Sequence, residues 1–230
     1  MEQLCLAIYE EDYDMVDLLL MNGAKCNSEV MDCVADSGNM DILDLIIEYP
    51  HDNFTPAAID NAACNGDIAM VMRLTFEFNA TCTTNAIDNA ADNGFLNIIQ
   101  FILQNIDNSN FTSNAMDFAA EHGHLNVVRY LHSTGIASCT TNAMDYAAMG
   151  GHLDVVKFLH ENRKEGCTVN AMDGAAAGGF IDVVEWLYKN RSEGCSSNAM
   201  EMAIENGHYG MVLWLYKNGC NISSSVEVLS

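Results

Sequence analysis

Apolar residues in this chain fall into short clusters separated by glycine. In "TNAMDYAAMGGHLDVVKFLH", which begins at Thr141, small and apolar residues surround the pair Ala147-Ala148, and Gly150-Gly151 follows them. A second cluster is apolar at Val155, Val156, Phe158 and Leu159, the i, i+1, i+3, i+4 spacing of an amphipathic helix. The pattern predicts two short helices, with glycine ending the first.

The two-helix pattern returns along nearly the whole chain. The glycine that ends the first helix recurs every 28 residues, with one step of 29, at Gly38, Gly66, Gly94, Gly123, Gly151, Gly179 and Gly207. A degenerate first copy, "LCLAIYEEDYDMVDLLLMNGAKCN", precedes these seven. Neither helix can bury its apolar face alone, so the copies must stack on one another. The sequence therefore predicts an all-α solenoid of about eight helix-turn-helix repeats.

We expect one domain over residues 1–230, divided into repeats of nearly equal length. The predicted repeats are roughly 1–27, 28–54, 55–82, 83–111, 112–139, 140–167, 168–195 and 196–222. Residues 223–230, "SSVEVLS" with the preceding serine, align with the opening of a further copy and are interpreted as a C-terminal stub or partial cap.

In five copies, an acidic residue follows an asparagine by three positions at the start of the predicted first helix. Asn142 and Asp145 are one such pair, and the spacing resembles a capping box in which the asparagine is the N-cap. The pairs Asn85/Asp88, Asn114/Asp117, Asn170/Asp173 and Asn198/Glu201 repeat it. We expect these acids to serve helix capping, because a ladder of single carboxylates is too widely spaced for a calcium site.

The segment "NAMDYAAMGGHLDVVKFL" resembles the ankyrin repeat, whose pattern is T-P-L-H-x-A-A-x-x-G-H-x-x-V-V-x-x-L-L. The pairs Ala147-Ala148, Gly151-His152 and Val155-Val156 match this pattern directly. The period of 28 is shorter than the usual ankyrin period of about 33. The resemblance therefore implies an ankyrin-type solenoid whose β-hairpin fingers are shortened or absent. This short form resembles repeats of oomycetes, other protists and giant DNA viruses.

Five of the nine cysteines occupy one phase of the repeat, namely Cys26, Cys82, Cys139, Cys167 and Cys195, and phenylalanine replaces them in two copies. The exchange with phenylalanine indicates a buried apolar position. Neighbouring copies should lie about 8–10 Å apart, whereas a disulfide needs Cα atoms within about 7 Å. We therefore expect nine free thiols and a reducing, cytoplasmic location.

Aromatic and histidine residues also recur at fixed positions of the repeat, so that stacking of the copies aligns them in ladders. His124, His152 and His208 share a phase with Phe95 and Phe180, which indicates packing rather than ligand binding. Phe101, Tyr130, Phe158, Trp186 and Trp214 follow the second helices and are expected in the core. The chain carries no P-loop, G-x-S-x-G or H-E-x-x-H motif. We expect no enzyme activity, no cofactor and no metal site.

The chain is strongly acidic, with a formal net charge of −23. Residues 1–128 hold 21 acids against two bases, and residues 129–230 hold 11 acids against seven bases. Such a charge repels nucleic acid and anionic membrane surfaces, so neither is expected as a partner. Two interpretations of the acidic half stay open: a solvated surface, or a surface that steers a basic partner.

Three positions vary among the copies while their neighbours stay fixed: one just before the Ala pair and two just after it. In the ankyrin family the two positions after the pair lie on the concave face and contact partners. Carried over with the position before the pair, the resemblance implies a protein-binding surface of Asp92, Asn93, Glu121, His122, Tyr146, Met149, Met202, Glu205 and Asn206. The small residues at 174–178 should leave a shallow notch beside Tyr146 and Met149. An unconstrained solvent face is the alternative.

The favoured hypothesis is a monomeric, non-catalytic protein-protein interaction scaffold that binds a partner protein on its concave face. A basic partner steered by the acidic half is one form of it. The alternative is a substrate-recognition protein of the ubiquitin-ligase adaptor type, or a host-directed effector of a virus or protist. The adaptor role would need an F-box or similar segment, and the sequence shows none.

Overall fold

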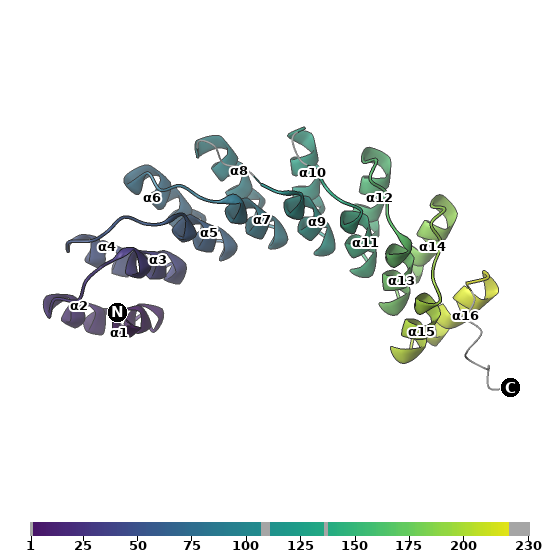
Figure 1. The fold of residues 1–230 in the computed structure, drawn as a ribbon, viewed down its shortest axis with the longest axis horizontal. Helices are drawn as coiled ribbons and strands as arrows, with labels where there is room; N and C mark the ends of the chain where they lie inside the picture. The colour runs from purple at the N-terminus through teal and green to yellow at the C-terminus, as the bar shows by residue number, and fades with distance from the viewer. Residues whose placement is uncertain (1, 107–110, 136–137, 221–230) are drawn as a thin grey trace. The chain divides into compact units, whose positions relative to one another are not determined.

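The computed structural model describes residues 2–106, 111–135 and 138–220, and within them it contains sixteen helices and no strand. The helices follow one another as pairs, each pair formed by one copy of the repeat (Figure 1). The prediction of an all-α ankyrin-type solenoid is therefore confirmed. In place of a hairpin finger, the described residues contain a single isolated bridge between Cys26 and His51. None of the described helices is long and apolar enough to cross a membrane.

The helices belong to two compact units, Met1–Thr112 and Ser113–Ser230, which we describe separately. The first unit contains α1 (Glu2–Tyr9), α2 (Tyr13–Met21), α3 (Ser28–Ser37), α4 (Met40–Ile47), α5 (Pro56–Cys64), α6 (Ile68–Phe78), α7 (Thr84–Asp92) and α8 (Leu96–Asn105). In this unit α1, α3, α5 and α7 pack side by side, and each also packs on the even-numbered helix that follows it. The odd helices thus form one layer and the even helices another.

The second unit repeats this arrangement. It contains α9 (Ser113–Glu121), α10 (Leu125–Ser133), α11 (Asn142–Met149), α12 (Leu153–Asn162), α13 (Val169–Ala177), α14 (Ile181–Asn190), α15 (Asn198–Glu205) and α16 (Tyr209–Lys217). Helices α9, α11, α13 and α15 form the odd layer. Residues 223–230, including the stub interpreted as a partial cap, lie outside the described residues.

The core of each copy lies between the two layers. Ala147 and Ala148 of α11 and Val155 and Val156 of α12 are completely buried, as are their counterparts in most copies. Alanine has the smallest apolar side chain, so the odd helices can approach closely along the pair. The aromatic ladder is less buried than expected: Trp186 and Trp214 are only half-buried, at the edge of the even layer. Their rings meet His160 and Tyr188 of the preceding copy edge-on, at centroid distances of 5.1 and 5.3 Å.

The prediction that these asparagines are N-caps is wrong for α7, α11, α13 and α15, because the threonine or serine two residues earlier accepts a hydrogen bond from the asparagine backbone amide. The Thr168 hydroxyl accepts a hydrogen bond from the Asn170 amide at 3.1 Å. The carboxylate of Asp145, in the preceding copy, accepts from both the Thr168 amide and the Thr168 hydroxyl, each at 2.7 Å. The acid therefore holds the helix start of the next copy and does not cap its own helix.

This contact, which we call the inter-copy clamp, recurs in both units. It joins Asp32 to Thr55, Asp60 to Thr83 and Asp88 to Thr112 in the first unit, and Asp117 to Thr140, Asp145 to Thr168 and Asp173 to Ser196 in the second. Five of the six acids are buried, and Asp145 is only 2% exposed. Burial raises the pKa of Asp117, although both hydrogen bonds from Thr140 act to lower it.

A second inter-copy contact places a ring against a glycine. Gly151 has φ +78°, and a Cβ atom there would lie 2.6 Å from Cδ1 of Phe180 in the next copy. His152 lies against Gly123 in the same way, and His208 against Gly179. The positive φ and the absent side chain both require glycine at these turns. The interpretation of His152 and His208 as packing residues is confirmed.

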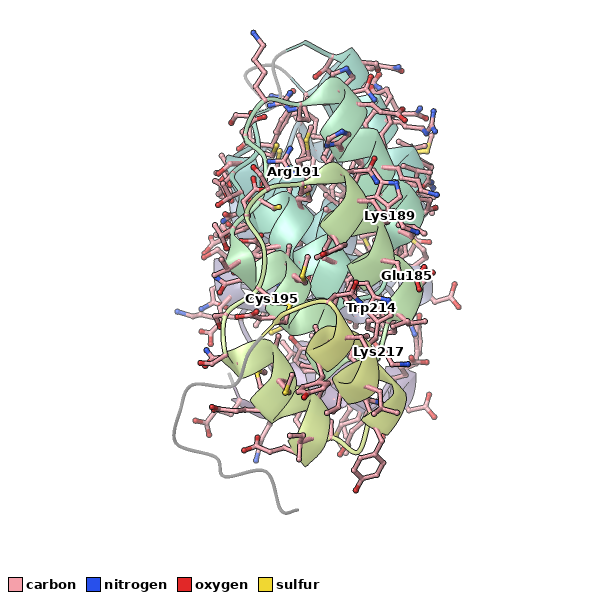
Figure 2. The ribbon with its side chains drawn as sticks, turned by 90° about the vertical axis from the view of Figure 1, so that its right-hand side faces the viewer. Glu185, Lys189, Arg191, Cys195, Trp214 and Lys217 are labelled. Carbon is pink, nitrogen blue, oxygen red and sulfur yellow. A yellow bond between two sulfur atoms is a disulfide. The ribbon has the colours of Figure 1, made fainter. Side chains whose placement is uncertain are left out.

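The prediction of nine free thiols is wrong, because Cys195 and Cys220 form a disulfide with Cα atoms 6.3 Å apart. Cys195 lies in the loop before α15 (Figure 2), and Cys220 follows α16. Cys220 does not belong to the cysteine ladder, whose next position would be Ser223, so the spacing between ladder positions does not apply to it. The other seven cysteines are free, and within the ladder Cys26, Cys139 and Cys167 are buried as expected.

We expect Asp145→Ala to lower the free energy of unfolding by about 2–4 kcal/mol, because the Thr168 amide and hydroxyl lose a buried, charged acceptor. Urea denaturation of the variant and the wild type measures the difference. Asp182→Ala is the control, since Asp182 is an exposed acid in the first turn of α14 and its removal should change stability by less than about 0.5 kcal/mol. Equal effects of the two substitutions would contradict the clamp.

We expect Cys220→Ser to destabilise the protein by about 3 kcal/mol, because the disulfide joins residues 25 apart in sequence and restricts the unfolded chain. Thermal unfolding with and without dithiothreitol measures the effect. Reductant should lower the melting temperature of the wild type to that of the variant and leave the variant unchanged. A wild type that is insensitive to reductant would contradict a structural role for this bond.

Candidate partner-binding surface

The nine residues assigned to protein binding lie at or near the C-terminal ends of odd helices. Asp92 ends α7, Glu121 ends α9, Met149 ends α11 and Glu205 ends α15, because the glycine-containing turn follows each of them. Asn93, His122 and Asn206 occupy the turns themselves. The first unit contributes Asp92 and Asn93, and the second contributes the other seven.

Most of these residues are accessible. Asn93, His122, Met149, Met202, Glu205 and Asn206 are exposed, and Asp92, Glu121 and Tyr146 are half-buried. The two methionines are 48% and 40% exposed, which is unusual for side chains of this size and polarity. In the second unit the odd layer therefore presents exposed apolar and acidic side chains together.

Some of the assigned residues also hold the copies together. The Asn206 side-chain amide donates to the Ala177 carbonyl at 2.8 Å, across from α15 to α13. Asn65, at the same position in the first unit, donates to the Asp36 carbonyl at 2.9 Å. Substitutions of Asn206 would therefore perturb the fold as well as any partner contact. The methionines are the better reporters of binding.

The notch expected beside Tyr146 and Met149 is occupied. A Cβ atom at Gly174 would lie 3.0 Å from Cβ and 3.1 Å from Cε of Met149, so the methionine side chain lies over that glycine. Gly174 is itself buried as a result. Met149 thus forms a small apolar surface across α11 and α13 where the sequence predicted a depression.

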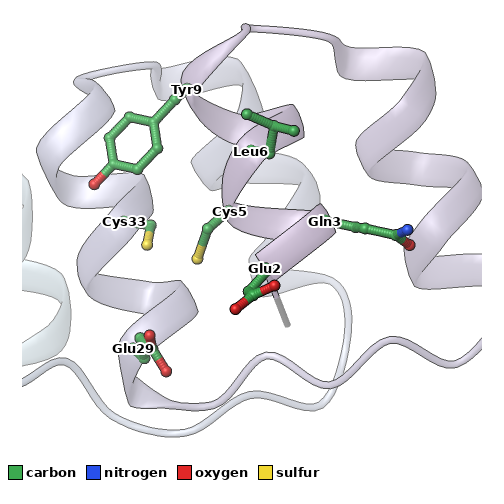
Figure 3. Close-up of a pocket in the computed structure, with 7 residues that line it drawn as sticks. All are labelled: Glu2, Gln3, Cys5, Leu6, Tyr9, Glu29 and Cys33. Carbon is green, nitrogen blue, oxygen red and sulfur yellow. The ribbon is translucent and has the colours of Figure 1, made fainter.

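A pocket between α1 and α3, in the first unit, was not predicted. It has a volume of about 890 Å³ and is lined by Glu2, Gln3, Cys5, Leu6, Tyr9, Glu29 and Cys33 (Figure 3). The Tyr9 hydroxyl donates to Asp36 Oδ2 at 2.8 Å, and burial together with this bond raises the pKa of Tyr9. Cys33 occupies the variable position before the Ala pair, and Cys5 precedes it by one period of 28. Extending the variable position into the first two copies could have revealed this pocket.

The electrostatics of the first unit are dominated by acids. It holds 19 Asp and Glu residues and two bases, Lys25 and Arg73. Arg73 forms ion pairs with Asp44 and Glu77 on the even layer. The positive charge of Arg73 is therefore neutralised by acids of the same layer. Lys25 is the other basic residue of this unit. Among the described residues, no three His, Cys, Asp or Glu side chains are placed to hold a metal ion.

Comparison with known families agrees with this architecture. The model of the family described as ankyrin repeats (3 copies) matches residues 59–142, 87–173 and 147–225. The overlapping matches cover more than half of the chain, so the chain belongs to the ankyrin repeat family. Proteins of this family are generally protein-protein interaction modules and typically lack catalytic activity. No curated protein gives a significant match.

We expect stability to rise with salt, because the acids of the first unit repel one another and salt screens this repulsion over about 10 Å at 0.1 M. Melting temperatures measured from low to moderate sodium chloride check this. Glu10→Gln with Glu48→Gln, which removes two exposed acids at the C-terminal ends of α1 and α4, should raise the melting temperature in low salt and reduce its salt dependence. A melting temperature that falls with added salt would contradict the expectation.

Proposed function

We propose that the chain is a non-catalytic, monomeric scaffold that binds a partner protein through the C-terminal ends of its odd helices. The observation that carries the proposal is the division of each copy into two kinds of position. Residues that build the core and the clamp repeat from copy to copy, whereas the exposed residues after the Ala pair differ. A surface that varies on a repeated frame suits the recognition of one particular partner.

The partner that we propose carries a basic surface. The first unit presents 19 acids against two bases, and one of those bases is already ion-paired. Complementary charge would raise the association rate, and the effect would weaken as salt increases. In the second unit, Met149 and Met202 supply apolar area of the kind that contributes most to affinity when a partner buries it.

The surface can be tested with a matched pair of variants. Met149→Ala with Met202→Ala changes the odd layer of the second unit. Met21→Ala with Met72→Ala removes two methionines of comparable exposure, 69% and 42%, from α2 and α6 of the even layer. All four side chains are exposed, so both double variants should fold as the wild type does.

We expect the odd-layer variant to bind partner proteins from the source organism at least about tenfold more weakly than wild type, with the even-layer variant unchanged. Affinity capture followed by titration of the captured protein measures this, and binding should weaken as sodium chloride increases. If the even-layer variant loses binding while the odd-layer variant keeps it, the proposed surface is wrong. If affinity does not depend on salt, the basic partner is wrong.

A further inference from the structure

Two cysteine thiols lie side by side in the pocket between α1 and α3. Cys5 of α1 and Cys33 of α3 both line this pocket, and Figure 3 shows their sulfur atoms projecting into it from the two helices. Both residues are half-buried, so the pair is reachable from solvent through the pocket. The helices that carry them pack directly against each other.

We propose that Cys5 and Cys33 are a site of reversible oxidation, at which a disulfide oxidant such as glutathione disulfide joins α1 to α3. A disulfide requires sulfur atoms about 2.05 Å apart on backbones whose Cα atoms are within about 7 Å. Helices α1 and α3 bring Cα atoms within 8 Å of one another, so a local shift can join thiols on their facing sides. The inference is independent of any binding partner.

The reaction consumes one glutathione disulfide and yields two glutathione thiols. The Cys33 thiolate attacks one sulfur of glutathione disulfide, forms a mixed disulfide and releases the first glutathione thiolate. The Cys5 thiolate then attacks the Cys33 sulfur of that mixed disulfide and releases the second. Two protein thiols are oxidised to one disulfide, their two protons pass to solvent or to the released thiolates, and one glutathione disulfide is reduced.

The order of these steps follows from the surroundings of Cys5. Burial, the hydrogen bond and charge of Cys33, and the carboxylate of Glu29 raise the pKa of Cys5 to about 12. Cys5 therefore resists ionisation in the reduced pair, and we assign the first attack to Cys33. Once Cys33 carries glutathione, its thiol no longer opposes ionisation of Cys5, and burial is the main effect that still does.

The cysteines of the buried ladder have different surroundings. Burial raises the pKa of Cys139 and of Cys167 to about 11, and their side chains hydrogen-bond to Arg163 and Arg191 respectively. Cys26 is 3% exposed. These thiols lack the combination of a thiol neighbour and an open pocket that defines the Cys5–Cys33 site. The Cys195–Cys220 bond shows that this fold accommodates a disulfide between segments of one unit.

The test is a redox titration of the full chain in glutathione buffers, quenched by acid and alkylation and read by peptide mass spectrometry. We expect a linked peptide containing Cys5 and Cys33 that lacks two hydrogens and disappears on reduction. The link should form at a glutathione ratio at least about tenfold more reducing in the folded protein than in denaturant, because the fold holds the thiols together. Cys64→Ser, which removes a half-buried thiol of α5, should leave the titration unchanged.

Two further variants separate the proposal from general thiol reactivity. In Cys33→Ser we expect Cys5 to be recovered as a thiol or a glutathione adduct, and never in a link to another cysteine. Cys5→Ser should leave Cys33 as a glutathione adduct. If the folded wild type yields glutathione adducts at both positions without the link, or if the link forms equally well in denaturant, the proposal is wrong.

Discussion

The structure depends on a buried carboxylate that accepts two hydrogen bonds from the start of the next copy. A carboxylate suits this place because it only accepts hydrogen bonds, and the backbone amide and hydroxyl of threonine or serine both donate. Burying such a charge is costly unless donors compensate it. The raised pKa of Asp117 is the physical trace of that cost, since burial outweighs the two bonds from Thr140. Hydrogen bonds to a charged group are about twice as strong as neutral ones, so the two bonds offset part of the desolvation while tying adjacent copies together.

The clamp acts together with other contacts between copies. The odd helices of adjacent copies pack side by side, and their Ala pairs are buried. The ring of Phe180 then reaches Gly151, and the ring of His208 reaches Gly179. These contacts lie in the interior or in the turns. The positions just after the Ala pair are exposed or half-buried and differ from copy to copy, although Asn65 and Asn206 there also bond to the preceding copy.

The sequence predicts well the elements that depend only on residues within one copy. Helix pairs, their glycine ends and the buried Ala and Val pairs follow from spacing within one copy. The clamp could not be found in this way, because Asp145 and Thr168 are 23 residues apart and the local pair Asn142/Asp145 already has capping-box spacing. The disulfide was not predictable from the cysteine ladder, because Cys220 lies outside that phase of the repeat.

For the candidate surface, the sequence predicted the positions of the residues but not the contacts of their side chains. Its positions followed from variation among copies together with the ankyrin resemblance, and the structure places most of them in the open. Side-chain contacts between copies were not predictable, and for this reason Met149 covers Gly174 where a notch was expected. The pocket of Cys5 and Cys33 lies in the two least regular copies, where the repeat pattern is hardest to align.

The distribution of acids separates what the fold needs from what it does not. In the first unit, Asp32, Asp60 and Asp88 form clamps, and Asp12 and Asp67 cap α2 and α6. Glu10, Glu11, Asp41 and Glu48 are exposed, and two of them lie at helix C-termini, where the helix dipole opposes negative charge. Acids at such places lower stability rather than raise it. The fold does not require the acids at the C-termini of α1 and α4, and the proposed basic partner would offset their repulsion.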